Sequence, residues 1–195
     1  LHSTSRRQRQ MCIRDRCPVT RINGISRTMY HNRDSVLLGF MATHQPAVWM
    51  GDYGYMTLMP QCGQLKLKPS ERQVRLDHAK ETLTPYYYKV STSRAGKEQE
   101  ITTELTASSH SSFFRITYPR HEKAYLYLEA GRGKKGGGIE IFPEKREIHI
   151  YNEDRHDAHL GPEPPNFRGY YVLKFSTDFA EYGTWKDSLT MVGKK

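Results

Sequence analysis

Residues 39–54 bring an imidazole, an amide, an indole and a carboxylate together in one predicted loop between two apolar runs. These groups belong to His44, Gln45, Trp49 and Asp52. Proteins bind a sugar ring with a flat aromatic face, which covers its C–H groups, and with short polar groups that reach its hydroxyls. Trp49 would supply the first, and the three polar side chains the second.

Two glycines in this loop, Gly51 and Gly54, would allow a sharp turn or a close approach of the backbone to a ligand. A purely structural interpretation is also open. In it, Trp49 fills the core, a backbone carbonyl satisfies His44, and Asp52 caps a turn. Composition alone favours the structural interpretation over a binding site.

A second candidate, Gly131-Arg132-Gly133-Lys134-Lys135-Gly136, fits the G-x-G-x-x-G pattern of dinucleotide sites. That site needs a helix after the glycines, so that the helix N-terminus meets the phosphate. An alternating run at 138–142 instead predicts a strand here. The glycines therefore indicate a hairpin loop, and no nucleotide site is expected.

A third candidate, residues 153–159, contains Glu, Asp and His side chains that could bind a metal. His156 and His159 have only the spacing His-x-x-His, which is far less specific than a zinc signature. We interpret the segment as a polar loop between strands.

The elements that must position these residues are short strands. Alternating or apolar runs are closed by Gly and Pro, as in antiparallel sheets, and they fall at 36–41, 55–59, 86–90, 100–108, 112–118, 124–130, 139–142, 147–151 and 169–177. Residues 70–81 are predicted to form one short helix or an irregular connection that crosses between strands. Many short strands without helices of ordinary length predict an all-β fold, a sandwich or barrel.

Strand faces can be assigned in three of these runs. Phe114, Ile116 and Tyr118 are expected to share a face, and so are Ile148 and Ile150. In 124–130, Leu126 and Leu128 are expected on one face of the strand and Tyr125 and Tyr127 on the other. The run at 169–177 is predicted to be the longest and last clear strand. Pro60 is expected to end the run at 55–59.

The chain has 195 residues, enough for one domain, and a formal charge of +9. Residues 1–16 hold five arginines against one aspartate, whereas the later charges are mixed. A basic arm that binds phosphates is one interpretation. However, this opening string has neither strand nor helix periodicity and resembles read-through of sequencing-adapter DNA. We therefore treat 1–16 as a non-native or disordered basic tail and 17–195 as the domain, with no nucleic-acid partner expected.

Cys12, Cys17 and Cys62 have the spacing of neither a metal site nor a disulfide framework. Cys62 is expected to be a buried small hydrophobic residue beyond a strand.

No stretch is apolar enough to span a bilayer, so no membrane partner is expected. The N-terminus shows no apolar signal region.

Four ordered segments resemble glycoside hydrolase family 92. GFMATHQPAVWMGDYGYMTLMP resembles the family's Gly-Phe, Thr-His and Gly-Asp segment, and LDHAKETLTPYYYKV its His-x-x-Glu block followed by Pro-Tyr-Tyr. ITTELTASSHSSFFRITYP and FRGYYVLKFSTDFAEYGTW resemble two strand segments of the same domain. In this sequence the His-x-x-Glu pair is His78 and Glu81. Together the segments span about residues 25–185.

The resemblance implies the N-terminal domain of a calcium-dependent, inverting exo-α-mannosidase. Its fold would be an antiparallel β-sandwich, galactose-mutarotase or supersandwich-like, truncated at both ends. Both catalytic carboxylates and the calcium ligands are expected in an (α/α)6 domain missing from this chain, so the fragment would bind no calcium and hydrolyse nothing. Mannose-terminated glycans and that missing domain are the expected partners, and the compartment would be periplasmic or extracellular.

Because of their positions in the matching segment, the resemblance implies that five residues bind mannose: His44, Gln45, Trp49, Gly51 and Asp52. The sequence Thr43-His44-Gln45-Pro46 departs from the Thr-His-x-Ser-Gly motif that is commoner in the family. A stand-alone carbohydrate-binding sandwich without catalysis is the alternative from another class. A helical domain encoded downstream would favour the enzyme, and an early stop codon would favour the module.

Overall fold

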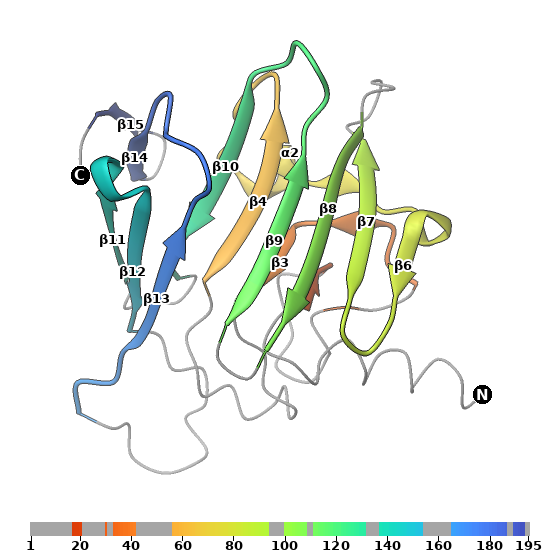
Figure 1. Cartoon of the computed structure of the whole chain (residues 1–195), viewed down its shortest axis with the longest axis horizontal. Helices are drawn as coiled ribbons and strands as arrows, with labels where there is room; N and C mark the ends of the chain where they lie inside the picture. The colour runs from red at the N-terminus through yellow and green to blue at the C-terminus, as the bar shows by residue number, and fades with distance from the viewer. Residues whose placement is uncertain are drawn as a thin grey trace.

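A computed structural model of the chain describes residues 17–20, 30, 33–41, 56–93, 100–108, 111–131, 137–153, 165–186 and 189–193. Every strand pair among these residues is antiparallel. The described helical elements are single turns. The all-β, antiparallel sandwich that the sequence predicts is confirmed (Figure 1).

The strands of the described ranges fall into four sheets. One has the order β1 (Cys17–Val19), β3 (Gly39–Met41), β4 (Thr57–Cys62), β10 (Ala124–Glu129). The largest runs β2 (Val36–Leu37), β5 (Val74–Arg75), β7 (Tyr88–Ser93), β8 (Glu100–Ala107), β9 (Ser112–Thr117), and β6 (Glu81–Leu83) also pairs with β7. The others are β11 (Gly137–Phe142), β12 (Glu147–Asn152), β13 (Gly169–Lys174), and the pair β14 (Gly183–Lys186), β15 (Leu189–Val192).

The predicted strand at 36–41 changes sheets in its middle. β2 pairs with β5 in the largest sheet, whereas β3 pairs with β1 and β4. The change occurs at Gly39, whose φ is +144°. A Cβ there would meet the Leu58 carbonyl oxygen at 2.7 Å and Thr57 Cγ2 at 2.8 Å. Only glycine therefore lets β3 lie this close to β4 at the point where the chain changes sheets.

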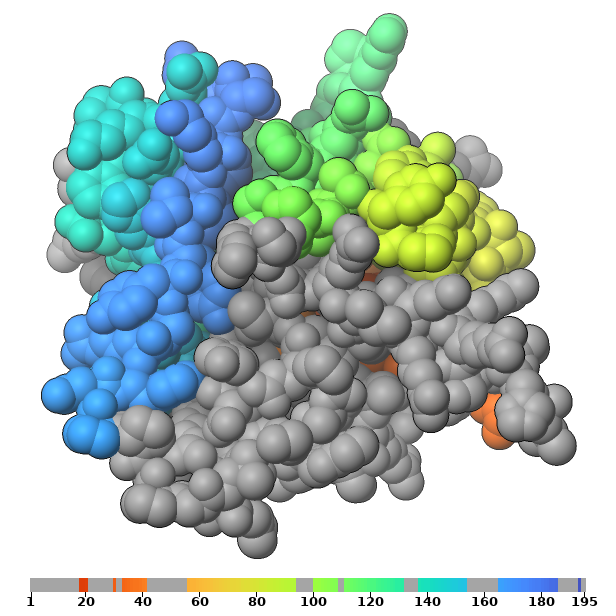
Figure 2. Space-filling model, turned by 60° about the horizontal axis from the view of Figure 1, so that its bottom comes forward, coloured from red at the N-terminus to blue at the C-terminus, as the bar shows by residue number. Residues whose placement is uncertain are grey.

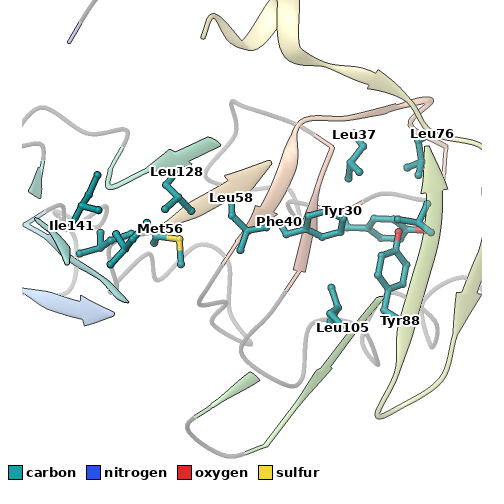
Figure 3. Close-up of a cluster of buried hydrophobic side chains, with 13 residues drawn as sticks. Tyr30, Leu37, Phe40, Met56, Leu58, Leu76, Tyr88, Leu105, Leu128 and Ile141 are labelled. Atoms are coloured by element: carbon teal, nitrogen blue, oxygen red, sulfur yellow. The ribbon is translucent and has the colours of Figure 1, made fainter. Parts of the chain in front are cut away.

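One apolar core joins three of the sheets (Figure 3). Phe40 of β3 is fully buried at its centre. Its ring meets Tyr88 and Phe114 edge-on, at centroid distances of 6.3 and 6.0 Å. Ile148 and Ile150 enter the same core from β12, so their predicted shared face is confirmed.

Two further predictions about strand faces have different outcomes. Phe114 and Ile116 lie on the half-buried side of β9 while Phe113 and Arg115 are exposed, as the alternation predicts. In β10, however, Tyr127 and Leu128 are both buried. The alternation fails to separate core from solvent there because other segments cover both faces of this strand.

Pro60 does not end its strand, since β4 continues to Cys62. Successive N–H groups of β4 point alternately toward β10 and away from it. The Gly63 N–H donates to Lys123 O, so the nitrogen of Pro60, three residues earlier, faces away from β10. On the other side, β3 pairs only with Thr57 and Leu58. Proline is tolerated because no described strand needs its missing N–H. Cys62 is half-buried and is the last residue of β4 rather than lying beyond it.

The irregular crossing predicted at 70–81 is confirmed, and two other sequence predictions are wrong. Residues 70–81 form a crossing, with one helical turn α2 (Pro69–Arg72), strand β5 and a 3₁₀ turn η2 (His78–Lys80); a second 3₁₀ turn, η3 (Pro143–Lys145), follows β11. Within the described ranges β8 is longer than β13, and β14 and β15 follow β13. A strand does follow the glycine tract, but β10 and β11 belong to different sheets, so the predicted hairpin is wrong.

Candidate functional site

The predicted sugar-binding residues His44, Gln45, Trp49, Gly51 and Asp52 lie outside the described residues. Both interpretations of them, as a binding loop and as ordinary core and turn residues, therefore stay predictions. The structure does describe the residues on either side, Met41 at the end of β3 and Met56 before β4.

These flanking residues are firmly anchored. Met41 lies directly opposite Thr57 in the β3–β4 ladder. Met41, Met56 and Thr57 are all buried. The described residues on both sides of 42–55 are thus held in the buried interior, and a rigid base of this kind is the support that a binding loop needs.

A buried ion pair adjoins the same point. Glu129 lies opposite Thr57 in the β4–β10 ladder, and its Oε2 accepts a hydrogen bond of 2.9 Å from Arg72 Nη2. Arg72 is buried, and its Nη1 also donates to Leu67 O at 2.6 Å. Within a poorly solvated interior the carboxylate compensates the charge of the guanidinium.

Two aromatic rings complete the surroundings of this pair. The Arg72 guanidinium lies 4.2 Å from the centroid of the Tyr127 ring. Tyr127 in turn stacks on Trp185 of β14, with centroids 5.3 Å apart and planes at 26°. The C-terminal strand pair is thus tied to β10 and α2. Sequence reasoning missed this cluster, because Arg72 and Glu129 are 57 positions apart and neither belongs to a local motif.

The structure brings His78 and Glu81 together with Tyr30 and Tyr88, which we call the Glu81 cluster. Tyr88 OH donates to Glu81 Oε1 at 2.5 Å, and Tyr30 OH donates to Oε2 at 2.9 Å. His78 Nδ1 lies 2.5 Å from Oε2. The carboxylate is buried, so the cluster satisfies a charge in the interior and joins η2, β6, β7 and Tyr30.

The proton arrangement in the Glu81 cluster follows from its acceptors. His78 Nε2 lies 2.8 Å from the Asp34 carbonyl oxygen, which can only accept, so Nε2 carries a proton. A hydrogen bond between Nδ1 and Glu81 then requires a second proton on one of those two groups. With both oxygens of Glu81 engaged, this cluster serves the scaffold.

Several connections lie at one end of the sandwich (Figure 1). The start of β4, the β6–β7 turn, the end of β8 and the start of β13 all lie toward the lower end of Figure 1. Tyr86, Phe113 and Tyr170, which belong to these regions, are strongly exposed. Figure 2 brings this end forward, with the β6–β7 turn (yellow) and β9 (green) on one side and the segment entering β13 (blue) on the other.

No group of three or more His, Cys, Asp or Glu side chains in the described part of the chain is arranged to hold a metal ion. Of the segment predicted to be a polar loop, only Glu153 is described, and it pairs with Arg168. None of the helical turns in the described ranges has the length and apolar character that crossing a bilayer needs.

Comparisons with known proteins agree on one relationship. The family model for the glycosyl hydrolase family 92 N-terminal domain matches residues 15–195. A solved family GH92 inverting mannosidase from Bacteroides thetaiotaomicron is 35% identical, with a TM-score of 0.78 over 92% of this chain and 23% of that one. No curated protein sequence matches.

Two more distant structures show the fold alone. A family GH92 α-mannosidase from the same bacterium is 23% identical, with a TM-score of 0.55 over 70% of this chain and 19% of that one. A gh92 family glycosyl hydrolase is 14% identical, with a TM-score of 0.52 over 69% and 19% of the two chains. The chain thus spans about a quarter or less of the length of each of these structures.

Proposed function

The chain belongs to glycosyl hydrolase family 92, whose N-terminal domain it matches, and from this premise we propose that it acts as part of an inverting exo-α-mannosidase and forms one wall of the pocket for a terminal mannose. The observation that carries the proposal is the 35% identity over 92% of the chain to an inverting mannosidase. Mannose-terminated glycans are the proposed substrates.

A domain of a larger enzyme is favoured over a stand-alone binding module, because the chain spans only 23% of that mannosidase. We place the catalytic acid and base in an (α/α)6 domain outside this chain. An inverting enzyme needs two carboxyl groups roughly 6.5–9.5 Å apart, with a water molecule between one of them and the sugar. The carboxylates of Glu81 and Glu129, which are 7% and 15% exposed, are already bound to tyrosines and His78 or to Arg72.

Calcium dependence is proposed on the resemblance alone, and its ligands are assigned to the same catalytic domain. The ion would be held by oxygen ligands and would help to bind and orient sugar hydroxyls. A periplasmic or extracellular location is proposed on the resemblance alone.

For the mannose pocket we propose Trp49 as the stacking surface and His44 and Asp52 as hydrogen-bonding groups, with Gln45 and Gly51 beside them. Three features support this assignment. The segment has the residue types for sugar binding, its described flanking residues are buried where β3 ends and β4 begins, and the start of β4 lies at the same end of the sandwich as the β6–β7 turn and the start of β13 (Figure 1).

The purified 195-residue chain is expected not to hydrolyse 4-nitrophenyl α-mannoside, with or without added calcium. The physical reason is that both carboxyl groups needed for inversion lie, on this proposal, outside the chain. Release of 4-nitrophenol is measured against buffer. Turnover that follows the protein through size-exclusion chromatography would show that the chain carries its own catalytic groups.

Methyl α-mannoside is expected to change the fluorescence of Trp49 saturably. The chain has two tryptophans, so a Trp185→Phe variant reports on Trp49 alone and keeps an aromatic ring on Tyr127. Half a pocket binds weakly, and a dissociation constant on the order of millimolar is expected, about 4 kcal/mol of binding free energy.

The matched control is Trp49→Phe, in which only Trp185 reports and no saturable change is expected. Adding Asp52→Ala to the Trp185→Phe chain should weaken the response. Absence of any response from Trp49, or an equal response with methyl α-glucoside and methyl α-mannoside, would refute the mannose pocket.

A further inference from the structure

Arg168 is held on the outer face of the β11–β12–β13 sheet by three partners. Its Nη2 lies 2.7 Å from Glu153 Oε1, and its guanidinium lies 4.9 Å from the centroid of the Tyr151 ring. An interaction with the neighbouring Tyr170 side chain is the main cause of the raised pKa of Arg168. A side chain fixed in this way loses little conformational entropy when it binds a ligand.

The same face is locally flat. Gly138, Tyr151 and Tyr170 form one cross-strand row, in which Tyr151 lies opposite both of the others. A Cβ on Gly138 would lie within 2.2–2.9 Å of three atoms of the Tyr151 side chain. The Tyr151 ring therefore lies against the backbone of β11, where only glycine leaves room for it.

Tyr170 is the exposed aromatic residue of this row. Its exposed fraction is 71%, and that of Val172, two residues further along the same face, is 64%. The alternate residues of β13, Tyr171 and Leu173, pack against the core. The outer face of β13 thus presents large apolar groups that the described core does not use.

We propose that Tyr170, Arg168 and Glu153 form a second carbohydrate-contact surface, which takes neutral mannose units beyond the terminal one. The Tyr170 ring offers a stacking face, and Arg168 and Glu153 offer hydrogen-bond donors and acceptors to neighbouring hydroxyls. The charges of Arg168 and Glu153 compensate each other, which matches an uncharged ligand, whereas an anion would meet the carboxylate.

The surface lies at the same end of the sandwich as the described start of β4 (Figure 1). Tyr151 and Tyr170 lie where β12 ends and β13 begins, the end of the sandwich at which β4 starts (Figure 1). This inference rests on the proposed mannosidase function for the identity of the sugar. Its chemistry rests only on the residues of the outer face.

The test is affinity electrophoresis of the 195-residue chain in native gels that contain soluble yeast mannan. The chain is basic, with a pI of about 9.5, so it is run toward the cathode at neutral pH. Tyr170→Ala is expected to weaken mannan binding about three- to tenfold, as loss of one aromatic contact implies. Tyr170→Phe keeps the ring and should bind within about twofold of wild type. Val172→Ala is the matched control on the same strand and face, and no change is expected.

The outcomes separate this surface from the mannose pocket. Loss of retardation in Tyr170→Ala but not in Trp49→Ala supports the surface even if the pocket proposal fails. Equal retardation of wild type and Tyr170→Ala, no retardation of wild type, or equal retardation by dextran overturns it. Sedimentation velocity tests whether a second copy of the chain binds this face instead. A wild-type dimer that Tyr170→Ala dissociates would assign the face to that second copy and would also overturn the proposal.

Discussion

Phe40→Ala is expected to lower the free energy of unfolding by about 3–5 kcal/mol, the cost of removing a buried aromatic side chain and leaving a cavity. Phe40 is fully buried where β3 meets the largest sheet, and its ring contacts those of Tyr88 and Phe114. Because Gly39 and Phe40 stand where the chain changes sheets, little rearrangement is available to refill the space.

Urea denaturation followed by circular dichroism measures this effect. Phe113→Ala is the matched control, since Phe113 is 77% exposed and its loss should change stability by no more than about 0.5 kcal/mol. If Phe40→Ala does not fold at all, Phe40→Leu, which retains most of the volume, should show an intermediate loss. Equal effects at the two phenylalanine positions would contradict the described core.

Arg72→Ala is expected to destabilise the chain by about 3–5 kcal/mol, because it leaves the Glu129 carboxylate without its buried partner. The substitution also removes the guanidinium from the face of Tyr127. The double variant Arg72→Met/Glu129→Leu removes both charges and keeps apolar volume. It should recover most of the lost stability, since a buried ion pair is often no more stable than an apolar replacement.

The control for this prediction is Arg115→Ala. Arg115 is largely exposed, its Nη1 lies 3.7 Å from Glu104 Oε2, and such a pair contributes at most about 1 kcal/mol. Similar losses for Arg72→Ala and Arg115→Ala in urea denaturation would show that the Arg72–Glu129 pair is not desolvated. Because Glu129 lies opposite Thr57, the Arg72 variant should also weaken the mannoside response of Trp49.

Much of the architecture could be predicted from local patterns. The alternation at 112–118 and 147–151 predicted strands with Phe114 and Ile116 on one face and Ile148 and Ile150 on one face, and the structure places both pairs on the more buried side of their strands. The four ordered segments indicated the family that the comparisons then showed. The proposed mannose-binding residues were predicted only from residue types and resemblance, and the structure describes just the buried positions that flank them.

The amino-acid sequence by itself determined where strands form and which side of most strands is apolar, because these properties depend on neighbours one or two positions away. Tertiary structure alone decided that residues 36–41 serve two sheets, that Tyr127 is as buried as Leu128, and that Arg72 reaches Glu129. It also decided that Arg168 is fixed among Tyr151, Glu153 and Tyr170. Sheet pairing and the burial of charges depend on residues tens of positions apart, whose proximity no local periodicity encodes.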